Sequence, residues 1–211
     1  MSHGIASIIS ILSKIYAHNL NKLKSGKMLI EAVNYLLFYQ QDIKEYSSCF
    51  PNIVSLKNHK KNNSRLAWCY GDLGIGIALL NTANNINDNT LREEAIGILL
   101  HSARRKDLKE NNVLDAGVCH GTAGIAHIFN RAYRYTQIEE FKVASEYWFG
   151  QTLKMAKFED GLAGFKTWRT PEYGGWQNEY GLLQGIAGIG LSMISAISDI
   201  EPKWDECLLL S

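Results

Sequence analysis

The sequence predicts an all-α fold in which buried inner helices alternate along the chain with outer helices that carry a charged face. Two features carry this prediction: a glycine-led motif occurs four times, and an amphipathic segment lies in each gap between the copies. The 211 residues include only three prolines, which suits a helical protein because proline interrupts helices.

The four copies share a polar or aromatic residue, a glycine, two further residues, a small residue and then an apolar run. They read "HGIASIISILSKI" from His3, "YGDLGIGIALLNTA" from Tyr70, "HGTAGIAHIFNRAY" from His120 and "QGIAGIGLSMISAI" from Gln184. Each run is apolar nearly all round, so we expect each to form a buried helix. A glycine at the start lets the backbone turn tightly into that helix.

The gaps between the copies hold segments of a different character, at 27–41, 91–105 and 139–156. Their apolar residues recur every three or four positions, as in Leu29 and Val33, and charged residues fill the opposite face. Such a pattern predicts helices with one side in solvent. The alternation therefore predicts an inner ring of helices wrapped by an outer ring.

Composition and charge exclude several functional classes. Twenty-two basic and 21 acidic residues give a net charge of +1, which is not the signature of a nucleic-acid binder. No stretch approaches the roughly 20 apolar residues of a membrane span, so we expect no direct membrane insertion. The N-terminus lacks the pattern of a secretory signal, and four cysteines in a chain of this size do not suggest a disulfide framework. We expect a cytoplasmic protein with free thiols.

Cys69 and the pair Cys119 and His120 stand at the same place in successive copies, just before the glycine that opens an inner helix. If those helices begin around one rim, two sulfurs and one imidazole converge there. That donor set predicts a zinc site with its fourth position open, as in catalytic zinc centres. The alternative is that both cysteines are plain core thiols. Cys49 and Cys207 lack this register and are expected to be structural or incidental.

Three more residues are candidates for catalysis at the same rim. His3 occupies in the first copy the place of His120 and could act as a general acid, or could be a polar residue at a frayed helix start. Tyr70 could donate a hydrogen bond to a developing anion, or simply pack. Arg65 could hold negative charge, or belong to a solvated basic loop. Asp115 could cap a loop or orient His120.

The segments "WCYGDLG", "CHGTAG", "GLLQGIAGIGL" and "SHGIAS" resemble the lanthionine synthetase C family, the LanC-type lantibiotic cyclases, and the resemblance extends to the C-terminal "WDECLLLS". It implies an α/α toroid of seven inner and seven outer helices, of which residues 1–211 would form a single partial domain. That domain would hold about four inner helices with the intervening outer helices and would lack the N-terminal half. By position, the resemblance implies zinc on Cys69, Cys119 and His120, and catalytic roles for His3, Arg65 and Tyr70.

The function implied by the resemblance is that of a zinc-dependent enzyme of peptide modification. Such a lanthionine synthetase adds a cysteine thiol to dehydroalanine or dehydrobutyrine and so forms (methyl)lanthionine rings in a lantibiotic-type precursor. The implied partners are the dehydrated precursor peptide and a complex with a lantibiotic dehydratase and a transporter. An alternative is a truncated, non-catalytic zinc-binding helical module that binds a peptide or a partner protein. A glycan-cleaving toroid ranks last, because it needs paired carboxylates that the chain does not offer in register.

Overall fold

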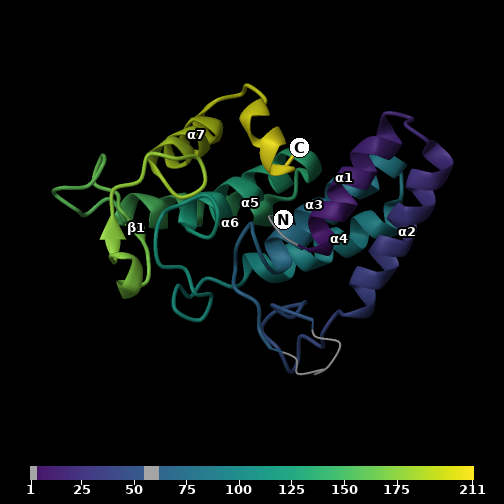
Figure 1. Cartoon of the computed structure of the whole chain (residues 1–211), viewed down its shortest axis with the longest axis horizontal. Coiled ribbons are helices and arrows are strands. Elements are labelled where there is room, and N and C mark those ends of the chain that lie inside the picture. The colour runs from purple at the N-terminus through teal and green to yellow at the C-terminus, as the bar shows by residue number, and fades with distance from the viewer. Residues whose placement is uncertain (1–3, 55–61) are drawn as a thin grey trace. The chain divides into compact units, whose positions relative to one another are not determined.

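The computed structural model describes residues 4–54 and 62–211, and helices make up most of it (Figure 1). The α-helices are α1 (Ile5–Ala17), α2 (Lys22–Phe38), α3 (Asp72–Ile86), α4 (Asn89–Ala103), α5 (Thr122–Thr136), α6 (Glu139–Lys154) and α7 (Ile186–Ile197). Two short 3-10 helices, η1 (Pro171–Tyr173) and η2 (Lys203–Leu208), and two strands, β1 (Thr167–Trp168) and β2 (Trp176–Gln177), complete the elements. The all-α prediction is confirmed, because each glycine-led run and each amphipathic segment forms a helix.

The chain divides into two compact units. The first unit comprises Met1–Arg65, Cys69–Arg105 and Asp205–Ser211, and the second comprises Leu66–Trp68 and Lys106–Trp204. Within the first unit, α1 packs against α2 and α3, and α3 packs against α4. Within the second, α5 packs against α6 and α7. Each unit therefore repeats the predicted pairing of an inner helix with an amphipathic outer helix.

The predicted burial of the glycine-led helices is confirmed for α3 and α5. Leu73, Ile77 and Leu80 of α3 are fully buried, as are Ile125 and Phe129 of α5. The outer helices contribute one face each, as the amphipathic pattern requires. In α4 that face carries the buried side chains Leu91, Ala95, Ile98 and Leu99.

The same prediction is wrong for parts of α1 and α7. Ile8 and Ile11 of α1 are 49% and 48% exposed, and Ile194 and Ile197 of α7 are 58% and 88% exposed. Within its unit α7 packs on α5, and α1 packs on α2 and α3. An apolar run predicts that a helix can be buried, whereas actual burial depends on how many neighbours surround it.

The strands form a small antiparallel hairpin in the second unit, in which Trp168 pairs with Trp176. Their ring centroids lie 5.2 Å apart, and Phe158 packs on Trp176 with centroids 4.9 Å apart. These aromatic contacts hold together a segment that has little other regular structure. Among the residues that the structure describes, no helix combines the length and apolar character needed to cross a bilayer.

Candidate metal centre

The loop before α5 is held in place by a buried carboxylate. Asp115 is 2% exposed, and its side chain accepts hydrogen bonds from the backbone N–H groups of Gly117 and Trp168, both at 3.0 Å. Its backbone carbonyl accepts a third from Thr122, also at 3.0 Å. Asp115 was expected either to cap a loop or to orient His120, and these contacts support the loop-capping role. They connect the loop to both the first turn of α5 and the hairpin.

A close backbone approach then fixes the path of this loop past the helix. A Cβ atom added at Gly124 would lie 1.8 Å from the carbonyl oxygen of Val118, so a residue with a side chain does not fit there. The N–H of Cys119 donates to the carbonyl of Leu183 at 2.8 Å. Cys119 and His120 lie between these anchored points, directly before the start of the helix.

Cys69 reaches the same loop through its neighbour in the chain. The N–H of Trp68, which belongs to the second unit, donates to the carbonyl of Cys119 at 3.1 Å. Because residues 68 and 69 share a peptide bond, this contact alone keeps Cys69 beside the Cys119 loop. Two residues later the chain turns at Gly71 with φ +80°, where a Cβ would lie 2.5 Å from the Ser64 hydroxyl oxygen. Only glycine accommodates both that φ and that contact.

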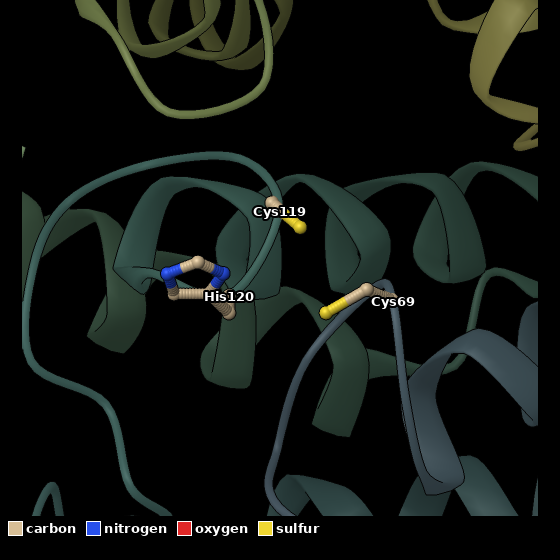
Figure 2. Close-up of side chains that lie close together, drawn as sticks. All are labelled: Cys69, Cys119 and His120. Carbon is tan, nitrogen blue, oxygen red and sulfur yellow. The ribbon is translucent and has the colours of Figure 1, made fainter. Parts of the chain in front are cut away.

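The three predicted ligands come together. One donor atom from each of Cys69, Cys119 and His120 lies within 4.8 Å of the other two. Figure 2 shows Cys119 and His120 on the loop before α5 and Cys69 on a second loop. Both sulfurs are free thiols. Cys69 is 5% exposed, whereas Cys119 and His120 are half-buried, so the cluster is accessible from solvent.

The cluster fits a zinc ion in both donor type and size. Zinc bonds to thiolate sulfur at about 2.3 Å and to imidazole nitrogen at about 2.0 Å, so two sulfurs on one zinc can be at most about 4.6 Å apart. The 4.8 Å upper limit on the spacing of the three donor atoms is close to that value. Three protein donors leave a fourth position for water or a substrate atom.

The other predicted site residues have different outcomes. Tyr70 follows Cys69, is 39% exposed and lines, with Cys69, a pocket of the first unit. Arg65 is half-buried on the segment that leads to Cys69 and is not among the described residues that line this pocket. His3 lies outside the described residues, although Gly4, which follows it, is described and lines the pocket.

A second cluster of potential ligands was missed by sequence reasoning. Cys49, Asp72 and His101, all in the first unit, also place their donor atoms within 4.8 Å of one another. The sequence did contain one signal for this cluster, namely Asp72 in the first turn of an otherwise apolar helix. A carboxylate that is buried with such a helix needs polar or charged partners. Asp72 is 0% exposed, and Arg105 donates to it at 3.1 Å.

The contacts of this second cluster form a structural hydrogen-bond network around Asp72 and do not indicate a metal site. The carboxylate of Asp72 already accepts the N–H groups of Cys49 at 2.9 Å and Phe50 at 3.0 Å. Burial, followed by the negative charge of Asp72, raises the pKa of Cys49 to about 12, so its thiol stays protonated. Burial also raises the pKa of Asp72, against the opposing effects of the Cys49 hydrogen bond and the Arg105 charge. Arg105 already supplies the local positive charge.

Comparison with known proteins agrees with the predicted fold. A family model described as lanthionine synthetase C-like protein matches residues 1–209. The solved structure of nisin cyclase is similar, with a TM-score of 0.76 and 21% sequence identity, over 99% of this chain and 48% of that chain. The chain thus spans about half the length of nisin cyclase. Its fold is similar to the helical toroid that the sequence predicted.

Proposed function

Because the chain belongs to the lanthionine synthetase C-like family, we propose that it acts as a zinc-dependent peptide cyclase. Its substrate is a precursor peptide that carries dehydroalanine or dehydrobutyrine, and its product is a (methyl)lanthionine ring. One observation carries the proposal: two thiols and an imidazole, from two separate turns of the chain, have donor atoms within 4.8 Å of one another. Cys69, Cys119 and His120 are the proposed zinc ligands.

The reaction is an addition in which no oxidant or reductant takes part. The peptide thiol loses its proton to water, and its sulfur forms a bond to the β-carbon of the dehydro residue. The electron pair of the C=C bond moves onto the adjacent carbonyl, giving an enolate whose α-carbon then takes a proton. A bound zinc ion would favour the thiolate, since an unperturbed thiol has a pKa of about 8.5.

The remaining steps fall to side chains of the chain itself. We assign the donation of the α-proton to His3, the role that its place in the first glycine-led copy suggests. Tyr70, half in solvent beside Cys69, is placed to donate a hydrogen bond to the enolate oxygen. Arg65 is the proposed holder of negative charge near the same turn. Asp115 keeps the Cys119 loop in shape through its backbone hydrogen bonds.

The chemistry of the substrate implies that another enzymatic reaction comes before this one. Dehydroalanine and dehydrobutyrine arise from serine and threonine by loss of water, so a dehydratase must supply the peptide. The four cysteines are free thiols, and two of them are proposed metal ligands, which fits the reducing cytoplasm.

Metal analysis of the purified protein tests the ligand assignment. We expect one zinc per chain in the wild type and loss of that zinc in Cys69→Ala and in Cys119→Ala. Cys49→Ala and Cys207→Ala are the matched controls, because they remove a thiol outside the cluster, and both should keep the metal. Zinc retained in both cluster variants would end the assignment.

A separate assay tests the reaction. Incubation with a dehydrated precursor peptide should consume its free thiols faster than the spontaneous rate, and His3→Ala should remove the acceleration. If zinc binds but thiol loss never exceeds the spontaneous rate, the cyclase proposal fails. The chain is then the non-catalytic zinc-binding module considered above.

A further inference from the structure

The first unit has an apolar pocket of about 290 Å³ whose wall includes Cys69. Helices α1, α2 and α3 contribute to it, together with the segment 50–54. Phe50 and Leu36 are almost fully buried at 1% and 5% exposure, whereas Ile53 is 65% exposed and Tyr70 39%. The pocket therefore has a buried apolar floor and an edge that opens to solvent.

The lining determines which kind of group can enter. None of the described side chains that line the pocket carries a charge, and its polar groups are tyrosines, one asparagine and the Cys69 thiol. A charged group would lose its hydration there without gaining a charged partner among those described side chains. An aliphatic or aromatic group would instead leave water for an apolar surface, which is favourable in proportion to the area buried.

The volume limits the size of the occupant. Pockets that bind whole small molecules occupy roughly 300 to 1,000 Å³, so this pocket lies at the lower limit of that range. It has room for one large side chain or two small ones, but not for a folded segment. The backbone of a bound peptide would stay outside, along the exposed edge.

Hydrogen bonds within the chain hold the floor of the pocket in place. The N–H of Phe50 donates to the Asp72 carboxylate at 3.0 Å, which fixes the segment 50–54 against the start of α3. Arg105 holds the other side of that carboxylate and donates to the carbonyl of Ser64 at 2.6 Å. A preformed pocket loses little conformational freedom when it binds.

From these observations we infer that the pocket is a subsite for an apolar side chain of the peptide substrate, next in sequence to the cysteine whose sulfur reacts. The inference rests on the proposed function, in which that sulfur is held at the cluster containing Cys69. Successive residues of an extended chain are about 3.3 Å apart. A side chain in a pocket that Cys69 itself lines thus belongs to the residue next to the cysteine that carries the held sulfur.

Binding of short labelled peptides to the purified full chain tests this inference. We would use acetylated hexapeptide amides with one cysteine, in which the flanking residue is leucine, serine, aspartate or lysine. Fluorescence anisotropy should give a dissociation constant about tenfold lower for the leucine peptide than for the other three. In a parallel series serine replaces the cysteine, so that thiol binding is absent, and the leucine preference should persist at weaker affinity.

A variant at the pocket edge links the preference to the pocket. Ile53→Asp places a carboxylate at an exposed position of the lining and should reduce the leucine preference below twofold without unfolding the protein. Ile43→Asp is the matched control, because Ile43 is 52% exposed and lies outside the described lining. Val54→Asp, at a position 39% exposed, repeats the test independently.

Each outcome separates the inference from the proposed function. Equal affinity for the four peptides, no binding at millimolar concentration, or a preference unchanged in both edge variants would overturn the inference. Thiol consumption at an enzymatic rate with no leucine preference would do so while leaving the cyclase proposal intact. A leucine preference in a protein that consumes no thiol would support the subsite and reject the cyclase.

Discussion

Removal of Arg105 tests the buried network at the start of α3. The side chain of Arg105 is 7% exposed and that of Asp72 is 0% exposed, with 3.1 Å between the paired nitrogen and oxygen. Arg105→Met keeps much of the side-chain volume but leaves the carboxylate buried with only its two backbone donors. Breaking a buried pair in this way costs about 3 to 5 kcal/mol of unfolding free energy. That range includes about 1 kcal/mol for the lost hydrogen bond from Arg105 to the carbonyl of Ser64, at 2.6 Å.

The assay is urea unfolding followed by far-ultraviolet circular dichroism. Arg104→Met is the matched control, because Arg104 is the exposed neighbour, and it should change stability by less than about 0.5 kcal/mol. The double variant Asp72→Asn with Arg105→Met removes both charges. It should cost about 2 kcal/mol less than the sum of the two single variants, because no unpaired charge stays buried.

If Arg105→Met lowers the unfolding free energy no more than the Arg104 control does, the buried pair does not have the role assigned to it. The same holds if the two single changes add without coupling, because the carboxylate and the guanidinium would then not depend on each other. Chemical unfolding of the wild type, the three single variants and the double variant, five proteins in all, at one pH and salt concentration distinguishes these results.

Two further predictions concern the second unit. Gly124→Ala should lower the unfolding free energy by about 3 kcal/mol, because its Cβ would lie 1.8 Å from a backbone oxygen. Gly190→Ala is the control, because a Cβ there meets no atom within 4 Å. It should not destabilise the protein in the same urea titration. The hydrogen bond from Arg169 lowers the pKa of Glu179. The contribution of the Arg169–Glu179 pair to stability is therefore complete above the ordinary glutamate pKa of about 4.3. It is lost as the pH falls through the lowered pKa of Glu179. The stability difference between wild type and Glu179→Gln should shrink below about pH 4, and a difference that grows there would contradict the assigned direction.

The sequence predicted those features that depend on local pattern. A glycine followed by an apolar run specifies where an inner helix begins, and three- and four-residue spacing specifies the outer helices, so the order of α1 to α7 follows. The cluster of Cys69, Cys119 and His120 was predictable for a related reason. Residues at the same position of repeated units occupy equivalent places in the fold, which brings them together without any contact being known in advance.

Features that depend on pairing between distant segments were not predictable from pattern. Asp72 meets Cys49 and Arg105, which lie 23 and 33 residues away and follow no common period. The exposure of Ile197 likewise depends on which neighbours cover α7, and a helical pattern does not contain that information. The pocket beside Cys69 requires the path of segment 50–54, which is neither helix nor strand.

The buried ion pair of Asp72 and Arg105 keeps the segment around Cys69 and the lining of the pocket in fixed positions within the first unit. A buried pair contributes little net stability compared with apolar packing of the same volume, so its main consequence is positional. One oxygen of Asp72 binds the N–H of Phe50, which forms the pocket floor, and the other binds Arg105. Arg105 in turn holds the carbonyl of Ser64, whose side chain packs against the turn at Gly71. Phe50 and Gly71, which both line the pocket, thus depend on a single carboxylate at the start of α3, and a change in that carboxylate should alter peptide preference and metal affinity together.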